Sequence, residues 1–157
     1  MNSENLAMGA RMYPAVTASA EGEPGSDIRG RRRHQAFPTL PSEQIARLEQ
    51  YGRRIDTRAG EVLHEPHERH RQLLVLLSGS LEITLPGVRG ESSITVLAPG
   101  EFTGEMSTLR GVAGFTRVRV REAGAVLAIE DERLRDLVQT DAELSELLMR
   151  AFILRRM

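Results

Sequence analysis

The 157-residue sequence contains no cysteine, no tryptophan and no lysine, so all of its 21 basic residues are arginines. Without cysteine the chain can form no disulfide, no thiolate metal site, no cysteine nucleophile and no dithiol redox centre of its own. Redox chemistry would therefore need a partner protein. The formal net charge is only -1, so the chain lacks the overall positive charge that supports nonspecific binding to nucleic acid.

The sequence also lacks a long apolar segment. None of its apolar runs approaches the roughly 18 residues that a membrane-spanning helix requires. The N-terminus does not show the basic, apolar and small-residue order of a secretory signal. We therefore expect a cytoplasmic protein without a membrane partner.

Composition changes sharply near Phe37. Residues 1–36 contain two prolines, four glycines and no apolar periodicity, which predicts a disordered tail that buries too little surface to offset its ordering entropy. The basic cluster at 29–34 is interpreted as a solvated charge run. Residues 37–157 are expected to form one domain, and deletion of residues 1–36 should leave its folding intact.

Within that domain, the first apolar pattern is helical. Ser42 or a neighbour is predicted to cap a short helix in which Ile45, Leu48 and Tyr51 share one face. From residue 54 to 129 the pattern changes to short apolar runs separated by glycine and proline, which is typical of an antiparallel sandwich or barrel. The predicted strands cover residues 61–64, 73–77, 81–85, 94–97, 115–120 and 125–129.

The strand at 81–85 has the clearest alternation. Its leucines and isoleucine alternate with Glu82 and Thr84, which predicts one buried face and one solvent-facing side. The pairs Ser78-Gly79 and Pro86-Gly87 are expected to mark its two ends.

Helical periodicity returns after residue 129, in two segments at 132–138 and from 141 to the end. The second opens with Thr140-Asp-Ala-Glu143, which has the spacing of a capping box. Its sheet-facing stripe is predicted to be Leu144, Leu147, Leu148 and Ala151. The fold class is therefore mainly β with flanking helices: an antiparallel β-roll, or double-stranded β-helix, with a short N-terminal helix and two C-terminal helices.

The final helix carries a second apolar face. Met149, Phe152 and Ile153 lie together, roughly 80° to 180° around the helix from Leu144. An exposed apolar face usually marks an interaction surface. We therefore predict self-association through this helix, or contact with a protein that follows it.

Three segments occur in an order that carries a family resemblance: 59–63 (AGEVL), 76–82 (LLSGSLE) and 97–105 (LAPGEFTGE). They resemble the signature of cyclic nucleotide-binding domains. The segment 137–156 is similar to one bacterial subgroup, in which this domain is the N-terminal sensor of FAD- and NADPH-dependent thioredoxin-disulfide reductases. In that subgroup a reductase follows the final helix, whereas this chain stops at Met157.

The resemblance places the ligand site in a phosphate-binding cassette between Gly104 and about Val118. In such a loop, backbone N–H groups and a helix dipole contact a phosphate, and a carboxylate accepts hydrogen bonds from a ribose hydroxyl. Glu105 matches the ribose acceptor of the family, or else it stabilises its own helix terminus. The candidate ligand-binding residues are Gly104, Glu105, Met106, Ser107, Arg110, Gly114, Phe115 and Thr116.

The cassette lacks one residue that the resemblance implies. The family places a phosphate-binding arginine nine residues after the glutamate, where this sequence has Gly114. Because side chains alternate along a strand, Arg117, Arg119 and Arg121 should face away from a pocket shared by Gly114 and Thr116. Arg110 is the one nearby candidate to replace the missing guanidinium, and the alternative is that it is solvated. Loss of such a contact costs roughly 2 to 5 kcal/mol, so tight binding of a cyclic nucleotide is not expected.

Another cluster, His64-Glu-Pro-His-Glu-Arg-His70, has metal-ligating residue types. Pro66 and the surrounding strand pattern place it in a strand end and loop, so we interpret it as a solvated loop and predict no metal site. The sequence contains no Walker loop, dinucleotide fingerprint or Ser/His/Asp order. We therefore expect no enzymatic activity and no cofactor in this chain.

The sequence favours a non-catalytic sensor domain with a degenerate cassette, which binds a cyclic nucleotide or another small anion and acts on a thioredoxin-reductase-like flavoenzyme. The alternative is a ligand-free interaction or dimerisation domain. Transcriptional regulators also use this sensor fold, but they require a helix-turn-helix after the long helix, and this sequence ends first. No nucleic-acid partner is therefore expected.

Overall fold

The computed structural model describes residues 38–68, 72–104 and 114–156, and the predicted tail at 1–36 lies outside them. The described chain begins with helix α3 (Ser42–Leu48) and a 3-10 turn, η1 (Glu49–Tyr51). The strands are β1 (Arg53–Asp56), β2 (Val62–His64), β3 (Leu73–Gly87), β4 (Gly90–Leu97), β5 (Phe102–Thr103) and β6 (Arg117–Ile129). Helices α5 (Asp131–Thr140) and α6 (Ala142–Arg156) follow. This is the predicted fold class: a mainly antiparallel β structure with a short helix before it and two helices after it.

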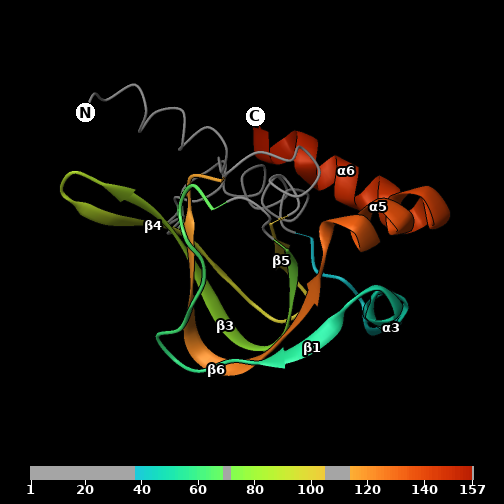
Figure 1. Cartoon of the computed structure of the whole chain (residues 1–157), viewed down its shortest axis with the longest axis horizontal. Helices are drawn as coiled ribbons and strands as arrows, with labels where there is room; N and C mark the ends of the chain where they lie inside the picture. The colour runs from blue at the N-terminus through green and yellow to red at the C-terminus, as the bar shows by residue number, and fades with distance from the viewer. Residues whose placement is uncertain (1–37, 69–71, 105–113, 157) are drawn as a thin grey trace, which may run out of the picture.

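The described strands form one antiparallel sheet in the order β1-β6-β3-β4, in which β2 also pairs with β6 and β5 with β3. Figure 1 shows the strands curling into a roll, with α3, α5 and α6 gathered at one side and the β3–β4 hairpin extending at the other. In the described part of the chain, no helix is long and apolar enough to cross a bilayer.

Two long strands replace four of the predicted ones. β3 continues through Ser78 and Gly79, so the prediction that this pair ends a strand is wrong. Gly79 has a φ of +84° and the pairing register shifts around it, which makes the pair a bulge. A Cβ at Gly79 or at Gly124 opposite would collide with the facing backbone, so both glycines permit the close approach that bends β3 and β6 together.

Side chains on β3 enter two separate cores because successive residues point to opposite faces. Leu74 and Leu76 enter the core inside the roll, whereas Leu73 and Val75 pack toward the helices. The helix-side core includes Leu134, Leu137, Leu144, Leu148 and Ala151, which confirms the stripe predicted for the last helix at three of its four positions. The fourth, Leu147, is half-buried and packs against this core. The uninterrupted apolar run at 73–76 is therefore a strand that is buried on both faces.

The predicted alternation at 81–85 is only partly correct. Leu81 and Ile83 are buried as expected, but Thr84 is buried as well, with an exposed fraction of 1%. A register shift between β3 and β4 falls between Ile83 and Thr84, which interrupts the simple two-residue period.

Both predicted helix caps differ from the structure. Ser42 is the first helical residue and Pro41 precedes it, without a side-chain capping bond. Thr140 ends α5, and its hydroxyl donates to the Asp136 carbonyl instead of capping α6. Asp141 is the capping residue of α6, because its carboxylate accepts a hydrogen bond from the Leu144 N–H at 3.1 Å.

Candidate functional site

The cassette begins at Gly104, directly after β5. Gly104 is buried and has a φ of +97°, a conformation that favours glycine. A Cβ at this position would collide with the Gln72 carbonyl oxygen and would lie 3.3 Å from Cε1 of His64. The backbone of β5 therefore passes into the cassette through a space that admits no side chain.

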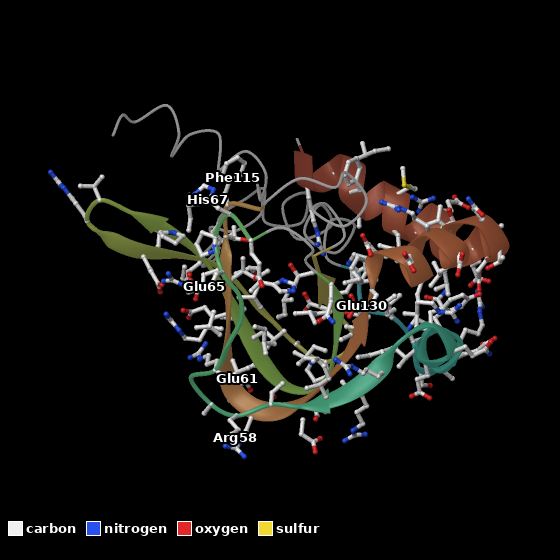
Figure 2. The ribbon with its side chains drawn as sticks, viewed as in Figure 1. Arg58, Glu61, Glu65, His67, Phe115 and Glu130 are labelled. Carbon is white, nitrogen blue, oxygen red and sulfur yellow. The ribbon has the colours of Figure 1, made fainter. Side chains whose placement is uncertain are left out.

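The far end of the cassette is held by a different contact. The Gly114 carbonyl accepts a hydrogen bond of 2.6 Å from the His67 N–H. The His67 ring meets the Phe115 ring edge to face, with centroids 5.9 Å apart. Figure 2 shows these two rings next to each other at the rim of the roll. Phe115 is 47% exposed, so this end lies at the surface.

One short segment therefore lies beside both ends of the cassette. It runs from His64 at the end of β2 to His67, which has a φ of +64° and is the one non-glycine residue with positive φ among the described residues. His64 is 3% exposed, so the interpretation of this cluster as a solvated loop is wrong for His64. Sequence analysis missed this role because the contacts join residues that are far apart in the chain.

The same histidine segment carries metal-ligating residue types. Within residues 38–68, 72–104 and 114–156, no group of three or more potential ligands is arranged to hold a metal ion. His70, the last member of the cluster, lies outside the described residues.

The strand that leaves the cassette has two chemically different faces. Thr116, Val118 and Val120 are buried, whereas Arg121 is exposed and Arg117 and Arg119 are half-buried. Both half-buried arginines pair with the Glu91 carboxylate on β4. Arg117 also pairs with Glu65, at 3.2 Å. The three strand arginines therefore alternate with the buried residues, as predicted, and two of them, Arg117 and Arg119, pair with acidic residues.

The structure thus places four of the eight candidate ligand-binding residues. Gly104, Gly114 and Thr116 are buried, and Phe115 lies at the rim. The remaining candidates, Glu105, Met106, Ser107 and Arg110, lie outside the described residues.

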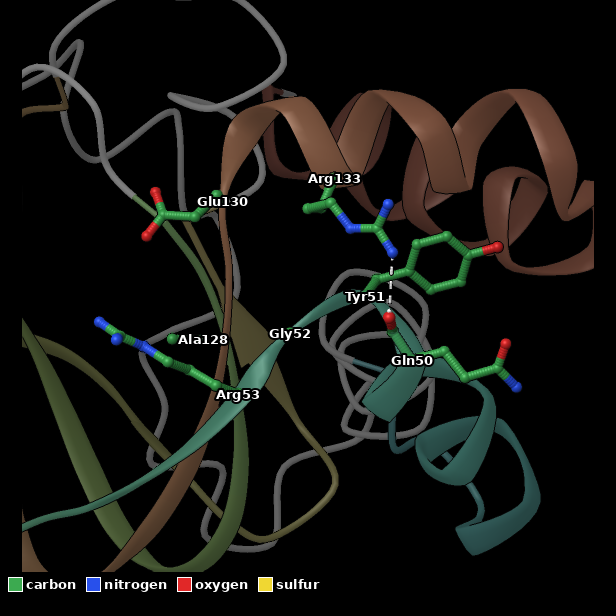
Figure 3. Close-up of a pocket in the computed structure, with 7 residues that line it drawn as sticks. All are labelled: Gln50, Tyr51, Gly52, Arg53, Ala128, Glu130 and Arg133. Atoms are coloured by element: carbon green, nitrogen blue, oxygen red, sulfur yellow. Dashed lines mark hydrogen bonds between the residues drawn. The ribbon is translucent and has the colours of Figure 1, made fainter.

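An open cavity of about 360 Å³ lies elsewhere, between η1, β1 and the start of α5. As Figure 3 shows, Arg133 lies over the Tyr51 ring and donates a hydrogen bond to the Gln50 carbonyl. Arg53 and Glu130 also line this cavity, so charges of both signs are present. None of the four candidate ligand-binding residues in the described part of the chain contributes to its lining.

The start of α6 is fixed by an ion pair with α3. The Arg47 guanidinium donates to both carboxylate oxygens of Asp141, with Nη2–Oδ1 at 2.6 Å and Nε–Oδ2 at 3.0 Å. The hydrogen bond from Arg47, together with the capping bond from Leu144, lowers the pKa of Asp141 below its usual value. The position of α6 therefore depends in part on a charged carboxylate.

Comparison with known families identifies this fold. The family described as cyclic nucleotide-binding domain matches residues 54–141, which is more than half of the chain. The chain belongs to this family. The match runs from β1 to the capping residue of α6, so the whole of α6 lies beyond it. Among curated proteins no significant match was found.

Solved structures of cyclic nucleotide-binding domains and related regulators share the fold. The N-terminal domain of a transcriptional regulator from Streptomyces coelicolor aligns with a TM-score of 0.60 and 24% identity, covering 79% of this chain and 89% of that one. The catabolite activator protein of Thermus thermophilus aligns with a TM-score of 0.60 and 21% identity, covering 76% and 55%. The c-di-GMP-responsive regulator CLP of Xanthomonas campestris aligns with a TM-score of 0.59 and 22% identity, covering 71% and 61%.

The predicted interaction face lies on α6, outside the family match. Met149 is 39% exposed and Ile153 is 56% exposed, which agrees with the prediction for these two side chains. Phe152 is half-buried, so the expectation that all three side chains are exposed is wrong for Phe152.

Proposed function

We propose that this chain is a non-catalytic regulatory domain in which the cassette recognises phosphate weakly and α6 carries the output to a partner. The observation that carries this proposal is Gly114, which occupies the place where the resemblance implies an arginine. It is buried, and its carbonyl is bonded to His67. On β6, Arg117 and Arg119 are paired with Glu91 and Glu65, and Arg121 is exposed, which argues against their replacing the missing guanidinium.

The first experiment measures binding by calorimetric titration and by thermal shift, with cyclic AMP, cyclic GMP and cyclic di-GMP as separate ligands. We expect no thermal stabilisation by cyclic AMP at tens of micromolar, because a ligand present far below its dissociation constant adds almost nothing to stability. A clear shift at micromolar ligand would contradict the proposal. It would also direct attention to Arg110 as the substitute guanidinium.

The matched variants are Gly114→Arg and Gly114→Met. Arginine restores the charge, whereas methionine adds comparable bulk without charge. We expect Gly114→Arg alone to raise the affinity for a cyclic nucleotide, by roughly 30-fold or more if the contact is desolvated. Equal affinities for the two variants, measured on proteins that both unfold cooperatively, would mean that the arginine is not the only missing contact.

The partner that we propose is a thioredoxin-reductase-like flavoenzyme, on the strength of the resemblance of residues 137–156 to sensors fused to such enzymes. The absence of cysteine fits this role, since the redox chemistry would belong to the partner. The test is NADPH-dependent disulfide reduction by such an enzyme, with and without this chain. An unchanged rate, at concentrations that saturate any complex, would remove the reductase from the proposal.

A second candidate function is a ligand-free interaction domain, and the exposed Met149 and Ile153 favour it. Self-association through α6 would then be visible by light scattering. We expect Ile153→Glu to yield a monomer while the roll stays folded, and Phe152→Glu to act in the same direction but to destabilise the helix as well, because Phe152 is half-buried. A monomeric wild-type chain at high concentration would exclude this candidate.

A further inference from the structure

A fully buried arginine lies in the last turn of α6. Arg155 is 1% exposed, which is unusual for arginine. Its Nη2 donates a hydrogen bond of 2.8 Å to the Phe102 carbonyl. Its guanidinium carbon also lies 5.0 Å from the centre of the Phe102 ring, within the range of a cation–π interaction. The end of α6 is therefore joined to one residue by two different interactions.

That residue belongs to the strand that leads into the cassette. Phe102 and Thr103 form the whole of β5, and Gly104 follows directly. β5 pairs with β3 over only two positions, Val75 with Phe102 and Leu74 with Thr103. Because so short a strand has few ladder hydrogen bonds, the bond from Arg155 adds a side-chain contact to a backbone that is otherwise paired over two positions.

The last turns of α6 also reach both hydrophobic cores. Ala151 is buried in the helix-side core with Phe102, whereas Leu154 packs against the core inside the roll. A movement of this helix end would therefore disturb the packing on both faces of the sheet. It would do so beside the strand that enters the cassette.

We propose that Arg155 is a positioning residue that couples the docking of α6 to the backbone of the cassette, so that the helix end and the Gly104 end of the cassette loosen or tighten together. The proposal gives the regulatory function a physical connection between the cassette and the output helix. The coupling has a biological role only if the proposed regulatory function holds, but the experiment that tests the coupling needs no ligand.

The test is amide hydrogen exchange, resolved residue by residue by NMR, on the full chain. In Arg155→Met the side chain keeps its apolar stem but loses the donor and the charge. We expect the amides of Thr103, Gly104 and the last turn of α6 to exchange about tenfold faster or more, because the bond to a buried carbonyl is lost. Amides of the β3–β4 hairpin should exchange as in the wild type.

The matched control is Arg150→Met on the same helix. Arg150 is exposed and pairs with Glu146 one turn away, so its removal should change neither region. Faster exchange in the last turn of α6 with unchanged exchange at Thr103 and Gly104 would overturn the proposal, because Arg155 would then anchor only the helix. Unchanged exchange in both regions would overturn it too.

Arg155→Lys provides a second measurement. Lysine keeps one charged donor but not the planar group that lies over the ring, so we expect intermediate exchange rates that rise together in the two regions. If Arg155→Met raises exchange throughout the sheet by global unfolding, Arg155→Lys decides the test. An increase in the last turn of α6 without one at Thr103 and Gly104 would then overturn the proposal. The hydrogen-exchange test does not use the nucleotide affinities of the Gly114 variants. The binding proposal and the coupling proposal can therefore fail separately.

Discussion

The two ends of the cassette are held in different ways. At the Gly104 end, the backbone passes against the Gln72 carbonyl. It directly follows β5, whose Phe102 is buried in the helix-side core and is joined to the buried Arg155. At the Gly114 end, a surface segment supplies one backbone hydrogen bond and one ring contact, and Phe115 is half-exposed. The same cassette is thus attached to the interior at one end and to a surface loop at the other.

The difference indicates where a signal can be transmitted. Elements with many buried contacts open at a high free-energy cost, whereas exposed contacts open easily. The Gly104 end should therefore move only together with α6. The Gly114 end should be able to adjust locally, without disturbing the helices.

The largest expected effect is that of Gly104→Ala. The substitution combines a positive φ with a collision against the Gln72 carbonyl, so we expect a loss of about 2 kcal/mol or more in the free energy of unfolding. Gly60→Ala is the control, since Gly60 has a φ of +86° but nothing within 4 Å of an added Cβ. Urea denaturation that gives equal losses for the two variants would show that the close approach at Gly104 contributes nothing.

The next effect concerns the helix that reaches the Gly104 end. In Asp141→Asn the capping oxygen remains, but the charge that pairs with Arg47 is lost. We expect the melting temperature to fall by about 2 °C to 5 °C at neutral pH. Glu143→Gln, at an exposed position beside the same arginine, should lower it less.

The pH dependence of this effect follows from the lowered pKa of Asp141. A carboxyl group whose folded-state pKa is depressed adds stability above its unfolded value, near 3.9, and loses that contribution as the pH falls through the folded value. The difference between wild type and Asp141→Asn should therefore be constant near neutral pH and should shrink below about pH 4. A difference that grows on acidification would contradict this assignment.

The features that the sequence predicts correctly are those that depend on contacts between residues close together in the chain. The stripe Leu144, Leu148 and Ala151 was predictable because it repeats within one helix, and the outward direction of Arg117 and Arg119 followed from strand alternation. Each of these patterns is local. The direction of these side chains follows from the period of the helix or strand alone.

The remaining features depend on contacts between distant segments. β1 and β5 have four and two residues, too few to show a period, and they were not predicted. Ser78-Gly79 resembled a turn, but the pairing of β3 with β6 makes it a bulge. The contacts of His64 and His67 with the cassette, and of Arg155 with Phe102, arise only after the roll has closed.

A smaller effect is expected at the Gly114 end. Glu65 pairs with Arg117 and belongs to the segment that carries His67, but its side chain is 55% exposed. Glu65→Gln should change the free energy of unfolding by less than about 1 kcal/mol, and the change should diminish at high salt because exposed ion pairs are screened. A larger loss that persists in salt would mean that this end is also held by the interior.

The smallest net effect should be that of His67→Gly, because two contributions oppose each other. Glycine removes the cost of a positive φ, about 1 kcal/mol or more, but it also removes the ring contact with Phe115, worth about 0.5 to 1.5 kcal/mol, and adds backbone entropy to the unfolded state. His67→Ala loses the ring and keeps the positive φ, so it should be the less stable variant. The difference between the two variants in urea denaturation reports the strain at this position minus the backbone entropy that glycine adds to the unfolded state. If His67→Ala is as stable as His67→Gly, the segment relaxes freely and the Gly114 end is even less constrained than the contacts indicate. If both variants lose several kcal/mol, the His67 ring is part of the core and the contrast between the two ends of the cassette does not hold.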